Sequence, residues 1–120
     1  RCVEVELNGW DTHINNHALQ SSLCNTLDAA LAATLQQLAQ RNLLESTLVL
    51  CGGEFGRTPT INVSGGRDHW PTGFSVLLAG GNIRPGIVVG ETSPDPDESP
   101  EKRMESVAQP VRVEDLHATM

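Results

Sequence analysis

The clearest pattern in the sequence is a stripe of apolar residues in its first third. Leucine and alanine recur at spacings of three and four residues between Leu23 and Leu38, which is the pattern of a helix with one apolar face. Ser21 or Ser22 can cap the start of such a helix. The pattern therefore predicts an amphipathic helix over about residues 20–42.

Short apolar runs on either side of this helix are typical of strands. Residues 3–7 alternate between apolar and acidic side chains, which is the period of a strand with one wetter face. Residues 47–51 and 74–79 are continuous apolar runs, and residues 87–90 form a shorter one. A strand, a helix and a strand in succession predict a βαβ unit, whose two strands run parallel. We therefore expect an α/β fold, a mostly parallel sheet with flanking helices.

Polar segments follow the predicted strands. Residues 10–13 come after the first strand, and residues 52–57 come after the second. Because the carboxyl ends of parallel strands share one edge of a sheet, these two segments should converge. Residues 53–73 form an unusually long loop, and loops of this length are more often functional than idle. If His69 of this loop lies at the same edge, the strand at 74–79 starts there and runs antiparallel to the other two.

The side chains on these segments are of the kinds that bind metal ions. Asp11 and His13 combine a carboxylate with an imidazole, the mixture that binds zinc, manganese or iron. The alternative is that Asp11 caps a turn and His13 is an ordinary loop histidine. Glu54 is a metal ligand or a general base in one interpretation, and a surface carboxylate paired with Arg57 in the other.

Arg57 and His69 also have two interpretations each. The guanidinium of Arg57 can bind an anionic substrate in a bidentate manner, or it can hold Glu54 in place. His69 is a further ligand, or a histidine hydrogen-bonded to the neighbouring Asp68. Three such segments predicted at one sheet edge are harder to explain by coincidence than one. We therefore expect a metal or anion site there.

Composition excludes several classes of protein. A chain of 120 residues forms one domain at most. A formal net charge of −7 argues against nucleic-acid binding, which needs a basic face. No run is long enough for a membrane span, and the three scattered cysteines form no disulfide or zinc framework. The motifs of serine hydrolases, P-loop enzymes and dinucleotide-binding proteins are absent.

The two ends and one internal segment bear on the domain organisation. The sequence begins within a predicted strand and stops in what reads as the first turn of a helix near Asp115. We therefore expect residues 1–120 to be one partial domain, the carboxyl-terminal part of a larger catalytic domain. Residues 93–110 combine prolines with many acidic side chains, which predicts an exposed segment.

Several segments, in this order and at these spacings, closely resemble one bacterial family. The family is called domain of unknown function 1501, is described as sulfatase-like and is placed in the alkaline phosphatase superfamily. The resemblance covers most of the chain and is weakest at residues 93–110. The segments that carry it are Gly9-Trp-Asp-Thr-His13, Thr47-Leu-Val-Leu50, Gly53-Glu-Phe-Gly-Arg-Thr-Pro59, Gly66-Arg-Asp-His-Trp-Pro71 and Phe74-Ser-Val-Leu-Leu-Ala-Gly-Gly81.

The resemblance implies part of an alkaline-phosphatase-like core, with the remainder of the domain upstream. It implies hydrolysis of a small anionic phosphate or sulfate ester, a divalent metal cofactor (zinc, manganese or calcium) and export to the bacterial periplasm. Under this resemblance Arg57 contacts the substrate oxyanion during catalysis. The implied metal ligands are Asp11, His13, Glu54 and His69.

The sequence departs from the superfamily pattern at several points. The usual D-x-x-x-H spacing of the first ligand pair would place Asn15, not His13, second. Glu54 is followed by Phe55 where relatives have histidine, unless residues 68–69 are that pair. The nucleophile of relatives lies upstream, so we expect no turnover from these residues alone. The alternatives are a non-catalytic metal- or anion-binding module that kept the fold, and a structural surface domain.

Overall fold

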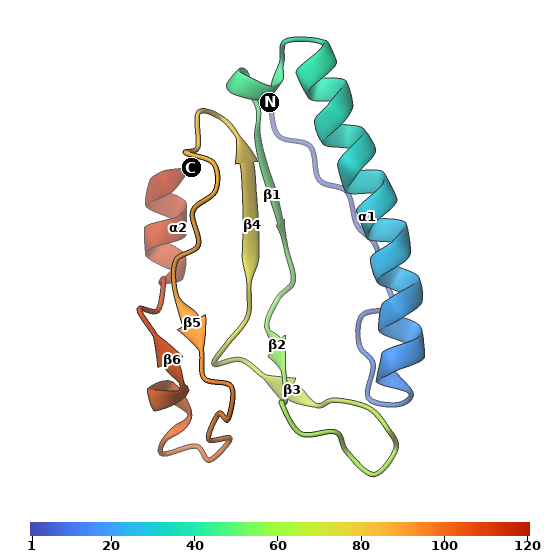
Figure 1. Ribbon diagram of the computed structural model, residues 1–120, viewed down its shortest axis with the longest axis vertical. Helices are drawn as coiled ribbons and strands as arrows, with labels where there is room; N and C mark the ends of the chain where they lie inside the picture. Colours follow the sequence, from blue (N-terminus) through green and yellow to red (C-terminus); the bar gives the residue numbers. More distant parts are fainter.

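Two helices and three two-stranded sheets make up the fold in the computed structural model, which describes residues 1–120 (Figure 1). The long helix α1 lies along one side of the central pair β1–β4, and α2, β5 and β6 lie on the other side. In chain order the elements are α1 (Asn16–Gln40), β1 (Leu48–Gly52), β2 (Gly56–Arg57), β3 (His69–Trp70), β4 (Val76–Gly80), β5 (Glu91–Thr92), β6 (Val107–Ala108) and α2 (Val113–Thr119), with 3-10 turns at Leu44–Ser46 and Arg103–Ser106.

All three sheets are antiparallel. β1 pairs with β4, so that Leu48 lies opposite Gly80 and Gly52 lies opposite Val76. β2 pairs with β3, and β5 pairs with β6. The predicted direction of the strand after the long loop is confirmed, because β4 runs antiparallel to β1. The predicted fold class, a mostly parallel sheet of the alkaline-phosphatase type, is wrong for this chain.

The predicted parallel sheet is absent because its first strand, expected at residues 3–7, does not form. Residues 3–7 belong to no strand, and Val3 and Val5 are almost fully exposed. An alternating pattern produces a strand only where a neighbour pairs with its backbone N–H and C=O groups, and residues 3–7 have no such neighbour. The strand predicted at residues 87–90 is absent for the same reason, and pairing begins only at β5.

The predicted long helix is present but starts earlier than its apolar stripe. It begins after Asn15, whose left-handed backbone (φ 47°) turns the chain into the helix, and neither Ser21 nor Ser22 caps it. The backbone N–H groups of Asn15 and Asn16 donate to Ser64 O and Gly65 O of a distant loop. The start of α1 is therefore fixed by tertiary contacts, which a local pattern does not contain.

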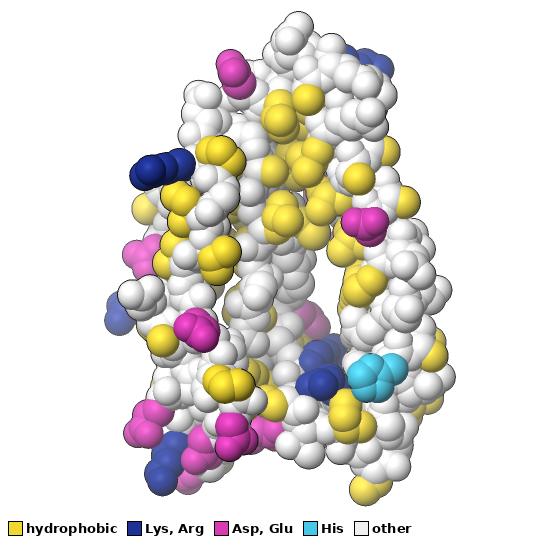
Figure 2. Space-filling view, viewed as in Figure 1, with side chains coloured by type: hydrophobic (Ala, Val, Ile, Leu, Met, Phe, Trp, Pro, Cys, Tyr) yellow, Lys and Arg dark blue, Asp and Glu magenta, His cyan; other side chains and the backbone are white.

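The chain encloses almost no apolar core. Trp70 is the one hydrophobic side chain that is buried, and five of 120 residues are buried in all. The accessible surface is 9217 Å², whereas a folded monomer of this size exposes about 6,300 Å². Figure 2 shows hydrophobic side chains gathered over the upper parts of β1 and β4 and along the facing side of α1. Neither helix combines the length and the apolar character that crossing a membrane requires.

Residues 93–110 fold back on themselves at the end of the molecule away from the first residue. β6 pairs with β5, and the backbone N–H of Asp97 donates to the buried hydroxyl of Ser106 over 2.8 Å. The acidic first turn predicted after this segment is present in α2, where the Asp115 carboxylate accepts from the Arg112 N–H at 3.1 Å. In both places the turn is held by hydrogen bonds between polar groups and not by apolar packing.

Candidate metal centre

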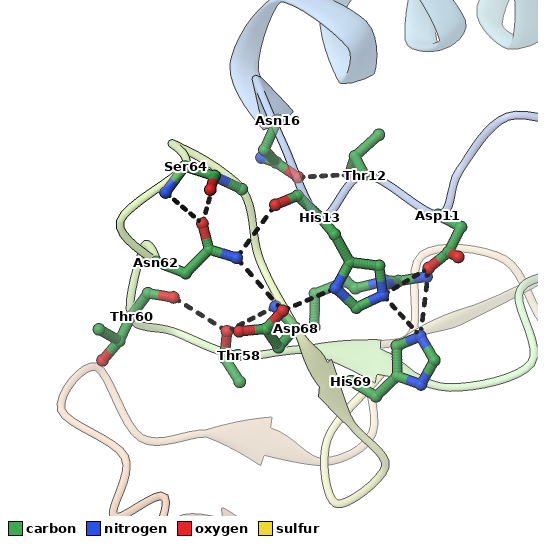
Figure 3. A network of polar contacts seen from close by, with 12 residues as sticks. Asp11, Thr12, His13, Asn16, Thr58, Thr60, Asn62, Ser64, Asp68 and His69 are labelled. Atoms are coloured by element: carbon green, nitrogen blue, oxygen red, sulfur yellow. Dashed lines mark hydrogen bonds and ion pairs between the residues drawn. The ribbon is translucent and has the colours of Figure 1, made fainter.

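The site forms where residues 11–16 lie against residues 62–67 (Figure 3). Main-chain hydrogen bonds join the two segments: the backbone N–H of Asn16 donates to Gly65 O at 2.8 Å, and the N–H of Arg67 donates to Thr12 O at 3.1 Å. An isolated β-bridge pairs Ile14 with Gly65. The long loop is therefore docked on the segment that precedes α1, and this brings distant polar side chains together.

Thr12 anchors the first of these segments to the helix. Its hydroxyl donates to the Asn16 side chain at 2.7 Å and accepts from Gln20 at 3.1 Å, and it is among the most buried side chains of the protein. Its neighbours Asp11 and His13 keep substantial exposure. A buried, fully bonded threonine between two exposed ligand-type residues fixes the backbone from which both project.

Three donor atoms from these segments meet in a small triangle. Nε2 of His13 lies 3.0 Å from Oδ1 of Asp11 and 3.1 Å from Nε2 of His69, and His69 Nε2 lies 3.1 Å from the same Asp11 oxygen. Figure 3 shows the three side chains pointing toward one another. Their side chains are 66% (Asp11), 42% (His13) and 49% (His69) exposed, so the triangle opens directly to solvent.

Arg57 lies beside this triangle on β2. Its Nη2 is 2.7 Å from Asp11 Oδ1, and its Nη1 is 3.4 Å from His13 Nε2. The side chain is only 16% exposed and its guanidinium lies over the Phe55 ring, 5.6 Å from the centroid. The antiparallel register places Arg57 opposite His69 on β3, which explains why both reach the same carboxylate.

Phe55, which follows Glu54, lies against one side of His69. Its ring lies 4.5 Å, centroid to centroid, from the ring of His69 at a tilt of 51°. This is the tilted arrangement that ring pairs prefer. Phe55 therefore supports His69 from one side, and it offers no ligand atom of its own.

Asp68 pairs with His13, whereas its sequence neighbour His69 pairs with Asp11. Oδ1 of Asp68 lies 2.6 Å from Nδ1 of His13, so the alternative in which Asp68 pairs with His69 is wrong. The hydrogen bond from His13 lowers the pKa of Asp68, and hydrogen bonds from His69 and then Arg57 lower the pKa of Asp11. Both carboxylates are therefore ionised at neutral pH and present negative charge to the two histidines.

Glu54 lies apart from these residues. It is exposed in the turn between β1 and β2 and makes no hydrogen bond or ion pair, either with Arg57 or with the histidines. The structure thus brings together four of the five predicted site residues, Asp11, His13, Arg57 and His69. The sequence predicts Asp68 as a hydrogen-bond partner of His69 or as half of an Asp-His ligand pair, and not as a partner of His13. It gives Asn62 no role, although the Asn62 side chain contacts both Asp68 and the backbone of His13.

The donor set fits a divalent ion of the zinc class. Two imidazoles and a carboxylate with one position left open are the ligand set of many catalytic zinc sites. A tetrahedral ion with bonds of about 2.0–2.1 Å separates its ligand atoms by about 3.3 Å, and the three donor atoms already lie 3.0–3.1 Å apart. Calcium prefers an all-oxygen shell, so this set suits it less well than zinc or manganese.

Comparison with known proteins identifies the family of this chain. Residues 1–120, the whole chain, match the family model described as Protein of unknown function (DUF1501), and the chain belongs to this family. The family expected from the motifs is therefore confirmed. Comparison with curated proteins and with solved structures gave no match.

Proposed function

We propose that this member of the DUF1501 family binds a divalent metal ion through Asp11, His13 and His69 and acts on a small phosphate or sulfate ester. The observation that carries the proposal is the triangle of donor atoms, each 3.0–3.1 Å from the other two, from residues up to 58 positions apart. Its openness to solvent leaves room for a substrate. The motif resemblance to sulfatase-like enzymes supports the ester class.

The side chains around the triangle have complementary roles in this proposal. A bound divalent ion supplies Lewis acidity at the ester oxygens. Arg57 donates to Asp11 through one nitrogen at 2.7 Å, and a guanidinium has five N–H donors, so others remain for the oxygens of an anion. Oδ1 of Asp11 is both a corner of the triangle and the oxygen that accepts from Arg57, so the ion and Arg57 compete for it.

The ion that we favour is zinc or manganese. Imidazole ligands disfavour calcium, which the motif resemblance alone leaves open. The two histidines must be neutral to bind an ion, so binding releases any protons they carry. Affinity for the metal is therefore expected to fall as the pH is lowered.

The described residues supply no free hydroxyl nucleophile beside the triangle. The hydroxyl of Thr12 is committed to Asn16 and Gln20, and that of Thr58 donates to Thr60 O and accepts from the Asp68 N–H. We therefore place the nucleophile in further polypeptide of the same domain. The surface of 9217 Å² exceeds that of a compact monomer by about 2,900 Å², which supports a covering partner for the β1–β4 sheet.

Metal binding is tested with the full-length polypeptide that contains these residues. Asp11→Asn, His13→Ala and His69→Ala should each remove most of the zinc measured by elemental analysis and weaken zinc binding in calorimetry. Glu54→Gln is the matched control, because it makes the same carboxylate-to-amide change at a residue outside the triangle. Unchanged zinc content in all three ligand variants would refute the metal site.

Turnover is tested separately with aryl phosphates and aryl sulfates. The hydrolase proposal predicts that the zinc-loaded protein releases the aryl alcohol and that Arg57→Gln lowers kcat/KM by about two orders of magnitude.

A second candidate function is a metal- or anion-binding module without catalysis. Phe55 lies tilted against His69 at the place where the resemblance to sulfatase-like enzymes implies a histidine ligand, and Arg57 is already paired with Asp11. Full zinc occupancy without hydrolysis of either ester would favour this module over the hydrolase.

A further inference from the structure

Asn62 is the most fully bonded polar side chain of the loop that carries Asp68 and His69. Its Oδ1 accepts from the backbone N–H groups of Ser64 at 3.0 Å and Gly66 at 2.9 Å. Its Nδ2 donates to His13 O at 3.0 Å and to Asp68 Oδ1 at 3.2 Å. A primary amide has two acceptor and two donor positions, so every one of them is used.

These partners allow only one orientation of the amide. Rotating it by 180° would place Oδ1 against a carbonyl oxygen and a carboxylate, and the NH₂ group against two N–H donors. The Nδ2 group is thus fixed between His13 and Asp68. It closes the loop, and it also sets where the Asp68 carboxylate lies.

The position of Asp68 determines which nitrogen of His13 carries the proton. An ionised carboxylate only accepts hydrogen bonds, so His13 Nδ1, 2.6 Å from Asp68 Oδ1, must be the donor. In the neutral ring the lone pair is then on Nε2. The guanidinium of Arg57 only donates, and its Nη1 lies 3.4 Å from that Nε2, which favours the lone pair there. Oδ1 of Asp11 lies 3.0 Å from the same nitrogen and only accepts, so Asp68, at the shorter distance of 2.6 Å, competes with Asp11 for the proton of His13.

We propose that Asp68, held in place by Asn62, is a positioning residue that selects the Nδ1–H tautomer of His13 and so presents the Nε2 lone pair to a metal ion beside Asp11 and His69. The metal part of this inference rests on the proposed function. The tautomer part concerns the metal-free protein and stands by itself. Outer carboxylates orient histidine ligands in this way in metalloproteins generally.

The decisive measurement is ¹⁵N NMR of the His13 ring in the metal-free, full-length polypeptide at a pH where the imidazole is neutral. The wild type should show the Nδ1–H tautomer, and Asp68→Ala should shift His13 to the Nε2–H tautomer. Zinc affinity measured by calorimetry should fall about 10- to 100-fold in the same variant. Asp97→Ala, another exposed and hydrogen-bonded carboxylate, is the matched control and should change neither value.

Two further variants distinguish an effect on the His13 tautomer from an effect on folding. Asn62→Asp keeps the shape and both acceptor contacts but replaces the two donors by an oxygen facing Asp68, so it should mix the tautomers and weaken zinc binding. Asp68→Asn keeps an acceptor at the same place, so it should retain most of the Nδ1–H form.

The two proposals fail in different ways. An unchanged His13 tautomer in both Asp68→Ala and Asn62→Asp would overturn the positioning role, even if zinc binding falls. A wild type that binds no zinc, with the tautomer still shifting in Asp68→Ala, would overturn the metal site and leave the positioning role intact.

Discussion

A Cβ atom on Gly66 would lie 2.0 Å from the carbonyl carbon of His13. A real Cβ atom never lies so close to a backbone atom. Residues 62–67 can therefore contact residues 11–16 here only because position 66 is a glycine. Gly66 is also one of the few buried residues of the protein. This backbone-to-backbone contact places His13 beside the stretch that carries Asp68 and His69.

Gly66→Ala should therefore separate the two segments. The loop must move, because the clash is with main-chain atoms that cannot rotate away, and we expect a loss of about 1–3 kcal/mol of unfolding free energy. Zinc affinity should fall at least about tenfold, as for loss of an outer-shell contact. Denaturant unfolding and calorimetry on the full-length polypeptide measure the two effects.

Gly86→Ala is the control for this substitution. Gly86 has a left-handed backbone (φ +73°) but no atom within 4 Å of a Cβ, so alanine should cost only the backbone strain of about 1–2 kcal/mol and should leave zinc binding unchanged. Wild-type zinc affinity in Gly66→Ala would contradict the importance of this contact.

Removal of the Arg57 charge should separate anion binding from metal binding. In Arg57→Gln we expect the Kd for inorganic phosphate or sulfate to rise at least about tenfold, because the proposed function gives Arg57 a charge-assisted contact with the anion. Zinc affinity should rise modestly, since Arg57 no longer competes for the Asp11 oxygen 2.7 Å away. Arg84→Gln, at an exposed arginine, should change neither constant. A fall in zinc affinity would show that Arg57 supports the metal ligands and does not compete with them.

The pKa of Asp97 predicts a pH effect at the other end of the molecule. Hydrogen bonds from the side chain and the backbone N–H of Ser99 hold this pKa below the ordinary value of 3.8. Because the folded pKa is the lower one, the contribution to stability is present above the unfolded pKa and is lost as the pH falls through the folded pKa.

A carbon-detected NMR titration of the Asp97 carboxyl group should thus give a midpoint below 3.8. Ser99→Ala should move the midpoint part of the way back, because the backbone donor remains, and Ser21→Ala on α1 should leave it unchanged. A wild-type midpoint at or above the ordinary value would show that the Ser99 contacts do not persist in solution.

The exposed sheet predicts how residues 1–120 behave when expressed alone. Leu50 of β1 and Leu77 of β4 are each exposed by more than two fifths, and a two-stranded sheet without cover is marginally stable. We expect strong binding of a hydrophobic dye and a broad denaturant transition with a small m value. Leu50→Gln should reduce the dye signal. A sharp transition with the m value of a compact domain would contradict this expectation.

Local patterns predicted the elements that need only local information. The helix expected over about residues 20–42 is α1, Asn16–Gln40, and the strand expected at 47–51 is β1. The strand expected at 74–79 is β4, also shifted by one or two residues. These runs are long or strongly apolar, so their pattern identifies them wherever they pack.

The sequence pattern does not show which segments pair with one another as strands. Residues 3–7 have the alternation of a strand but no neighbour to pair with, and this single failure changes the predicted sheet from parallel to antiparallel. The predicted meeting of Asp11, His13 and His69 was argued from the edge of that parallel sheet. In the structure they meet for another reason, the docking of residues 62–67 on residues 11–16.

The sequence does contain a local signal for Asn62. Asn62 stands two residues before Ser64 and the following Gly-Gly pair, and an asparagine side chain often closes a turn by bonding to the backbone two residues on. Glu54 shows the opposite case. Its place after a strand suggested a ligand, but β1 runs on to Gly52 and leaves Glu54 in an exposed turn.

Residues 62–67 dock on residues 11–16 through three main-chain hydrogen bonds and one donated by the Asn62 side chain. The outward side chains there, Ile14 and Val63, are largely or fully exposed and take no part in those contacts. A combinatorial library can therefore randomise both positions without disturbing the Asp-His-His triangle. Changes at these two positions should therefore leave the three proposed metal ligands in place.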